Sequence, residues 1–221
     1  MEIDYCDFPD DALCDPENNV WVRLDGASTA KVGITSVHAG LAGKLSKIKF
    51  KPIGTMLSRG QSIATIESVK YFGAVRTPLS GRLIAINIAL EGKPKLANDS
   101  PYDQGWFAQI ELTNGSNELP LLSDPRNIEE KLRTQIRDLR VRCFKAYPDY
   151  DMWEIGVECG AVLVRLNELM EHCSLDEIVH VVSDDPTADI EMVRWSDETA
   201  QVLLESRREG RLFHFIVKKV K

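Results

Sequence analysis

The sequence predicts a mixed fold, in which an all-β sandwich is followed by one helix and then by a two-layer α+β sandwich. Three observations predict it. Short apolar runs separated by turn residues fill the chain from Val20 to about Leu112, which is typical of an antiparallel sandwich. Apolar residues recur at helical spacing after Asp124. Beyond Pro148, strand-like and helix-like segments alternate, which is typical of an α+β domain.

The strands of the sandwich are expected in six segments, which are WVRLDG, STAKVGIT, GKLSKIKF, SIATIESV, GAVRTPLSGRLIAIN and GWFAQIEL. Each offers β-branched residues or alternating apolar positions. Turn chemistry separates them, in the form of DG, KPIG, SRG, LSG, EGKP and NDSP. The segment 1–17 that precedes them is an acidic N-terminal extension.

The single helix is expected to start at Asp124, an N-cap residue that is followed by proline. Its apolar stripe consists of Ile128, Leu132, Ile136, Leu139 and Cys143. Its end is expected near the Tyr147–Pro148 dipeptide, which places the domain boundary there. The first domain is therefore predicted to span 18–147 and the second 148–221.

The second domain is expected to have a βαβαββ order. The strands are DMWEIGV, EIVHVVS, QVLLES and RLFHFIVKK, and the helices cover 160–173 and 187–199. The helices are expected to cover one face of the sheet.

Composition excludes several classes of protein. The chain has 221 residues, of which 43% are hydrophobic and 28% charged, and its net charge is -7. A surface for nucleic acid or anionic membrane needs a local excess of Lys and Arg, so neither partner is expected. No apolar run approaches the roughly 20 residues that span a bilayer. The acidic start, MEIDYCDFPDDALCDPE, does not resemble a secretory signal, and we expect a cytoplasmic protein.

The cysteines are scattered, at Cys6, Cys14, Cys143, Cys159 and Cys173. They form no CxxC pair, and no histidine is placed to complete a metal site, so no metal centre is expected. In a reducing compartment a disulfide framework is not expected either.

The most informative stretch runs from Ile63 to Gly81, where two strand-like segments flank a tight turn that carries Lys70. A swinging-arm carrier needs this arrangement, because the amine must be exposed for acylation and a rigid hairpin must present it. The plain alternative is a solvated charge on a turn, which composition alone favours.

The residues around this turn resemble the glycine-cleavage H-protein family of lipoyl carriers. The resemblance rests on ATIESVK, TPLSGRLIAIN and LEGKPKLANDSPYDQGW and covers roughly 18–146. It implies lipoic acid attached to Lys70, with Glu67, Ser68 and Val69 forming the attachment motif. It further implies a carrier rather than an enzyme, and a lipoate ligase as a partner.

One competing family and one departure bear on this resemblance. A biotinyl domain would have Met on both sides of the lysine, whereas this chain has Val69 and Tyr71. The H-protein family usually has His-Glu before its early tryptophan, whereas this chain has Asn19 and Val20 before Trp21.

Cys159 stands between a predicted strand and a predicted helix. A thiol at a helix N-terminus faces free N–H groups and the positive end of the helix dipole, which favours the thiolate. A neighbouring carboxylate, Glu158, opposes it. The plain alternative is a buried cysteine at a strand–helix junction.

The second domain also resembles a family, the TusA/SirA sulfur carriers. The resemblance rests on the βαβαββ order, on Gly156-x-x-Cys159 and on the Asp184-Asp185-Pro186 segment. It implies a persulfide on Cys159 and a sulfurtransferase half-reaction there. The chain has Cys159-Gly160-Ala161-Val162 where that family has Cys-Pro-x-Pro.

Together the two resemblances imply a lipoate-binding carrier that shuttles sulfur intermediates on Lys70 in sulfur oxidation or transfer. Its partners would then be a heterodisulfide-reductase-like complex and sulfur-transfer proteins. The alternative is a glycine cleavage system H protein that carries an aminomethyl group between glycine-cleavage enzymes, with an accessory C-terminal interaction domain. A third interpretation makes the second domain a docking module without sulfur chemistry.

Overall fold

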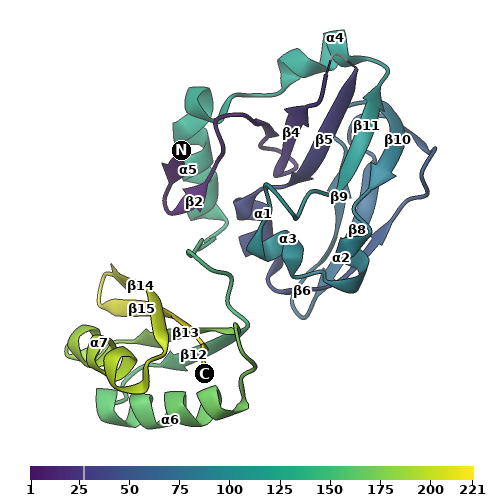
Figure 1. The fold of residues 1–221 in the computed structure, drawn as a ribbon. Coiled ribbons are helices and arrows are strands. Elements are labelled where there is room, and N and C mark those ends of the chain that lie inside the picture. Colours follow the sequence, from purple (N-terminus) through teal and green to yellow (C-terminus); the bar gives the residue numbers. More distant parts are fainter. Residues whose placement is uncertain (27) are drawn as a thin grey trace. The chain divides into compact units, whose positions relative to one another are not determined.

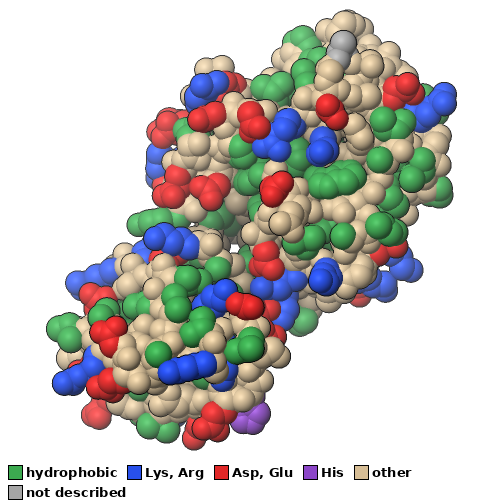
Figure 2. Space-filling model, viewed as in Figure 1, with side chains coloured by type: hydrophobic (Ala, Val, Ile, Leu, Met, Phe, Trp, Pro, Cys, Tyr) green, Lys and Arg blue, Asp and Glu red, His purple; other side chains and the backbone are tan. Residues whose placement is uncertain are grey.

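The computed structural model describes residues 1–26 and 28–221, and the chain divides into two units. Unit 1 comprises residues 1–143 and unit 2 comprises residues 144–221. Both combine sheets with helices (Figure 1), so the mixed, sheet-rich class predicted from the sequence is confirmed. Basic and acidic side chains are intermingled over the face of the units drawn in Figure 2.

Two antiparallel sheets form most of unit 1. The six-stranded sheet has the order β3-β4-β5-β11-β10-β7, with strands Leu13–Asp15, Val20–Leu24, Thr29–Ile34, Ala108–Leu112, Gly81–Ile86 and Met56–Leu57. The three-stranded sheet has the order β6-β8-β9, with strands Leu45–Phe50, Ser62–Ser68 and Phe72–Arg76. Both sheets contribute to one core, which includes Val32, Ile34, Ile63, Ile66 and Ile110. Burial of these β-branched side chains supplies the main stabilisation.

Short helices interrupt unit 1, so the expected all-β description is too simple. They are α1 (Ser36–Ala42), α2 (Ala89–Gly92), α3 (Leu96–Asp99) and α4 (Gly115–Glu118), followed by the 3-10 turn η1 (Leu119–Leu121). The Thr35 hydroxyl starts α1 by accepting a hydrogen bond from the backbone N–H of His38. The C-terminal end of this helix contacts the β8–β9 turn, because the Ser68 hydroxyl donates to the Ala42 carbonyl.

The expected helix from Asp124 is shorter than predicted. The Asp124 carboxylate accepts the Arg126 N–H over the 3-10 turn η2 (Pro125–Ile128), and α5 follows as Glu129–Asp138. Arg140 has a left-handed backbone (φ 52°), and the Val141 N–H donates to the Ile136 carbonyl. This Schellman-type end stops the helix well before Pro148. Cys143 therefore lies outside the helix.

Part of the predicted stripe has a partner surface in the N-terminal segment. Leu132 and Ile136 are buried in a cluster with Ile3, Cys6 and Phe8, and Ile128 packs against it. Leu139 is 38% exposed, contrary to the prediction. The segment begins with a small hairpin, β1 (Glu2–Ile3) and β2 (Cys6–Asp7).

The thiols of Cys6 and Cys143 form a disulfide, which contradicts the expectation that the chain has no disulfide framework. The partners are 137 positions apart, so no local spacing signals the pair. The free cysteines are Cys14, Cys159 and Cys173, and all three are buried.

Unit 2 follows the order strand, helix, strand, helix, strand, strand. Its sheet has the order β12-β13-β15-β14, with strands Tyr150–Glu154, Ile178–Ser183, Leu212–Lys218 and Val202–Glu209. The helices are α6 (Cys159–His172) and α7 (Ala188–Thr199). Their apolar stripes share a core with one face of the sheet, which includes Val162, Leu166, Trp195, Val181 and Phe215.

The opposite face of this sheet carries a buried histidine pair. His180 Nε2 lies 2.9 Å from His214 Nδ1, and His180 Nδ1 lies 2.8 Å from a carboxylate oxygen of Asp151. The Phe144 ring stands over both imidazoles. Across the described ranges, no helix is both long and apolar enough to cross a bilayer.

The disulfide predicts a redox-dependent stability of unit 1. Reduction should lower its free energy of unfolding by about 2–4 kcal/mol, because an open chain gains conformational entropy when the cross-link is lost. Urea unfolding with and without dithiothreitol measures the effect. Cys14→Ser, which leaves the disulfide intact, is the control. If alkylation without reductant labels five thiols rather than three, the pairing is wrong.

Candidate functional site

Lys70 lies at the tip of the hairpin that β8 and β9 form, and its side chain is exposed. The Ser68 N–H donates to the Tyr71 carbonyl at 2.8 Å, which closes a turn with Val69 and Lys70 at its centre. Below the turn, Glu67 pairs with Phe72 in the antiparallel ladder. The hairpin thus presents one amine at its end.

The Ser68 side chain holds the turn to the rest of unit 1. Its Oγ accepts the backbone N–H groups of Lys70 and Tyr71, at 3.2 and 3.1 Å. The hydroxyl donates to the Ala42 carbonyl, at 2.6 Å, in the last turn of α1. One hydroxyl therefore satisfies two turn amides and one helix-end carbonyl, groups that are costly to leave unpaired.

The stem of Lys70 rests on Gly43, the C-cap of α1. Gly43 has φ +78°, a conformation that favours glycine, and a Cβ there would lie 2.5 Å from Lys70 Cε. The amide of the buried Asn98 fixes this loop: Nδ2 donates to the Gly43 carbonyl at 2.9 Å and Oδ1 accepts the Leu45 N–H at 3.0 Å. The lysine stem is thus supported by residues of α1, α3 and β6 and the loop between them.

His38 and Tyr71 form a pair beside the turn. The Tyr71 hydroxyl lies 3.4 Å from His38 Nε2, and the two rings meet edge to face. Burial lowers the pKa of His38 to about 4, against a weaker opposing contribution from the Asn19 backbone. The imidazole is therefore neutral at pH 7. No pattern in the sequence indicated that His38 approaches the hairpin tip.

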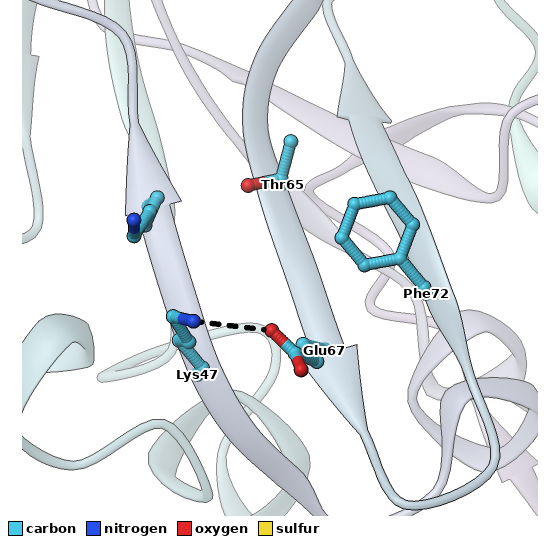
Figure 3. A pocket seen from close by; sticks show the side chains of 5 residues that line it. Lys47, Thr65, Glu67 and Phe72 are labelled. Carbon is cyan, nitrogen blue, oxygen red and sulfur yellow. Dashed lines mark ion pairs between the residues drawn. The ribbon is translucent and has the colours of Figure 1, made fainter.

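The other residues of the predicted motif face solvent. Glu67 forms an ion pair with Lys47, at 3.4 Å, and Val69 and Phe72 are 104% and 76% exposed. A shallow depression beside them is lined by Lys47, Lys49, Thr65, Glu67 and Phe72 (Figure 3). These side chains come from all three strands of the small sheet.

Cys159 is the first residue of α6, but its surroundings differ from those expected. The thiol is buried, and burial, followed by the charges of Asp185 and Glu191, raises its pKa to about 11. The Asp185 carboxylate accepts the Cys159 N–H at 2.8 Å, so a fixed anion occupies the helix end. Cys159 is 4% exposed and Cys173 8%, so the thiol at the start of α6 is no more accessible than the thiol after its end. Burial and the Asp185 carboxylate therefore disfavour the thiolate that the position at the start of α6 predicts.

Five residues support the turn, and the sequence alone predicted this supporting contact for none of them. They are Ser68, Gly43, Asn98, His38 and Tyr71. Asn98 lies in the LEGKPKLANDSPYDQGW segment on which the resemblance rests, and that segment does not indicate its contact with the loop after α1. The glycine directly after HAGLA, Gly43, was the available signal for a helix end. In the ranges 1–26 and 28–221, no three His, Cys, Asp or Glu side chains gather in a way that could hold a metal ion.

Comparison with known proteins adds to this geometry. Residues 14–135 match the family model described as glycine cleavage H-protein. The glycine cleavage system H protein 5 of Aquifex aeolicus is 36% identical over 147 residues, which are 64% of this chain and 98% of that protein. The probable glycine cleavage system H protein 2 of Sulfolobus acidocaldarius is 36% identical over 140 residues, 62% of this chain and 93% of that protein. The glycine cleavage system H protein of Stenotrophomonas maltophilia is 35% identical over 116 residues, 52% of this chain and 88% of that protein.

The Ser68 hydroxyl predicts a measurable rigidity of the turn. Ser68→Ala should destabilise the hairpin tip by about 1–2 kcal/mol, since two N–H groups and one carbonyl lose their partner. Hydrogen–deuterium exchange of peptides that cover residues 66–73 measures it. Ser68→Thr, which keeps a hydroxyl, should exchange like the wild type. Equal protection in the alanine variant would contradict this assignment.

Buried neutral His38 predicts a pH dependence. In the unfolded chain the imidazole takes up a proton below about pH 6.5, whereas in the folded chain it stays neutral down to about pH 4. Protons therefore favour the unfolded state in this window. The contribution of His38 should be complete above pH 6.5 and fall by roughly 3 kcal/mol as the pH approaches 4.

The measurement is the urea dependence of hydrogen exchange in β5 peptides at pH 7, 5 and 4, compared with His38→Gln. The glutamine variant does not titrate in this range, so its stability should vary less with pH. If the stabilities of the wild type and of His38→Gln depend on pH in the same way, His38 does not cause the pH dependence.

Proposed function

The chain belongs to the glycine cleavage H-protein family, and from this premise we propose that it carries lipoic acid on Lys70. Proteins of this family are carriers rather than enzymes, and they bear lipoic acid covalently on a lysine. The assignment to Lys70 is supported above all by its place at the tip of a rigid hairpin.

The surroundings of Lys70 fit the attachment of a long acyl group. Its side chain is exposed and, among the residues that the structure describes, makes no ion pair, whereas Lys47 pairs with Glu67 and Lys95 with Asp99. The backbone below it is held by Ser68, and the stem rests on Gly43. A fixed base with a free amine lets an attached arm sweep through solvent without moving the fold.

Lys70 itself has one chemical task. Its amine, in the neutral form, attacks an activated carboxyl group of lipoic acid; an amide bond forms, the activating group leaves, and the nitrogen loses a proton. When attached, the lipoyl group supplies a reducible disulfide at the end of a flexible arm, which suits it to accept cargo at one enzyme and release it at another.

The proposed cargo is an aminomethyl group, and the proposed partners are glycine-cleavage enzymes and the enzyme that attaches lipoate. The names of the relatives support this proposal, since proteins of three organisms that match the chain are glycine cleavage system H proteins. Unit 2 would then be an accessory interaction domain, because it lies outside the matched residues 14–135.

Sulfur shuttling is the second candidate. It is favoured by Cys159 at the first turn of α6, the position that a persulfide carrier would use. It is opposed by burial of this thiol and by the nearby Asp185 carboxylate, which together disfavour the thiolate. The aminomethyl cargo is therefore the better supported one.

Replacing Lys70 by Arg tests the proposal. Intact mass of the protein from its native host should show one lipoyl group on the wild type and none on Lys70→Arg. Stability should change by less than about 0.5 kcal/mol, since the side chain is exposed. Lys49→Arg is the matched control and should keep the group. A lipoyl mass on Lys70→Arg would refute the assignment.

An experiment in the native host distinguishes the two proposed cargoes. Glycine-cleavage activity in a host that loses Lys70 should fall, while its growth on reduced sulfur compounds should not. Loss of sulfur oxidation with intact glycine cleavage would favour the second candidate instead.

A further inference from the structure

The outward face of the three-stranded sheet lies directly beside Lys70 and has an unusual composition for this chain. The strand registers place Lys47, Glu67 and Phe72 in one row across β6, β8 and β9, and Lys49, Thr65 and Ala74 in the next row. Figure 3 shows the side chains of Lys47, Thr65, Glu67 and Phe72 on the same side of the sheet, around the shallow depression.

The charge of this face opposes that of the whole chain. The chain carries a net charge of -7, yet these two rows hold two lysines and one acid, and the acid is already paired with Lys47. Lys49 is exposed. The depression is thus bordered by a local positive charge, which attracts an acidic surface.

Its tip is apolar. Val69 and Phe72 are among the most exposed large hydrophobic side chains of unit 1, and they flank the lysine on either side of the turn. An exposed aromatic residue next to a depression is a common anchor of protein interfaces. Solvent exposure of both side chains has no benefit for folding, because burial of apolar surface is what stabilises a fold.

We propose that this face, composed of Lys49, Thr65, Phe72 and Val69, is the docking surface for the enzyme that acylates Lys70. The proposal rests on the proposed function. The partner's surface is acidic where it meets Lys49 and has an apolar recess for Phe72 beside its active site.

The position of this face next to Lys70 favours the acylating enzyme over the other proposed partners. An enzyme that acylates the amine must bring Lys70 itself into its active site. Its surface must therefore cover neighbours one or two strand positions away, at about 3.3 Å per residue. Enzymes that act on the end of a long attached arm can work farther from the hairpin. The residues next to the turn are thus best suited to recognise the acylating enzyme.

The test uses the full chain, a purified lipoate ligase of the same organism, lipoic acid and ATP. The readout is the initial rate of mass gain at Lys70 with the acceptor well below saturation. Lys49→Glu should lower this rate by roughly tenfold at low salt, and the difference should shrink at about 0.5 M salt, because screening weakens charge steering. Arg82→Glu, an exposed charge reversal on β10 of the other sheet, should react like the wild type.

Phe72→Ser should also lower the rate by roughly tenfold, but at both salt concentrations, because its contribution is apolar. Ile53→Ser, which replaces another exposed large hydrophobic side chain (60%, against 76% for Phe72), is its control. Hydrogen exchange of β8 peptides verifies that each variant keeps the hairpin.

The outcomes are distinct. If Lys49→Glu and Phe72→Ser react at the rates of their controls while the wild type is modified at Lys70, the docking surface is refuted and the carrier assignment stands. The surface is also refuted if the variants are acylated normally but fail only with glycine-cleavage enzymes. If the wild type gains no mass at Lys70, both proposals fail.

Discussion

The site depends on an exposed lysine and on a fixed backbone beneath it, and the hydrogen bonds of the Ser68 hydroxyl group make the two compatible. A carrier lysine has to be exposed, and a turn that is exposed loses the packing that normally keeps a backbone in one conformation. Ser68 replaces that packing with three hydrogen bonds, two within the turn and one to the end of α1. The hairpin tip is thereby stiff in its backbone although Lys70 and Val69 face water.

Hydrogen bonds of one polar side chain also fix the backbone beneath the turn. The loop after α1 supports the lysine stem, and loops carry free backbone groups that must find partners. The buried amide of Asn98 supplies both a donor and an acceptor to that loop, and glycine at position 43 leaves room for the stem. A chain of polar contacts thus runs from α3 through α1 to the turn, and each link has its hydrogen bonds satisfied.

Sequence patterns predicted the parts of this structure that depend on local order. Alternating apolar residues gave the strands around Lys70, and the lysine between two such strands gave the hairpin tip. Contacts between distant residues were missed. Asp185 caps the start of α6 from 26 positions away, which changes the chemistry of Cys159 without any local sign. The α5 helix (Glu129–Asp138) is terminated by Arg140 in a left-handed conformation that usually calls for glycine, so the sequence offered no stop signal there.

The disulfide has a mechanical consequence. Cys143 is the last residue of unit 1, and the chain continues from it into unit 2. Tension applied through unit 2 therefore enters unit 1 at a covalent junction and divides between the backbone that leads to α5 and the bridge to Cys6. The bridge leads into the small hairpin that packs on Leu132 and Ile136. A helix pulled from its end alone would unwind turn by turn, whereas here the pull is shared with the β1–β2 hairpin packed along its side.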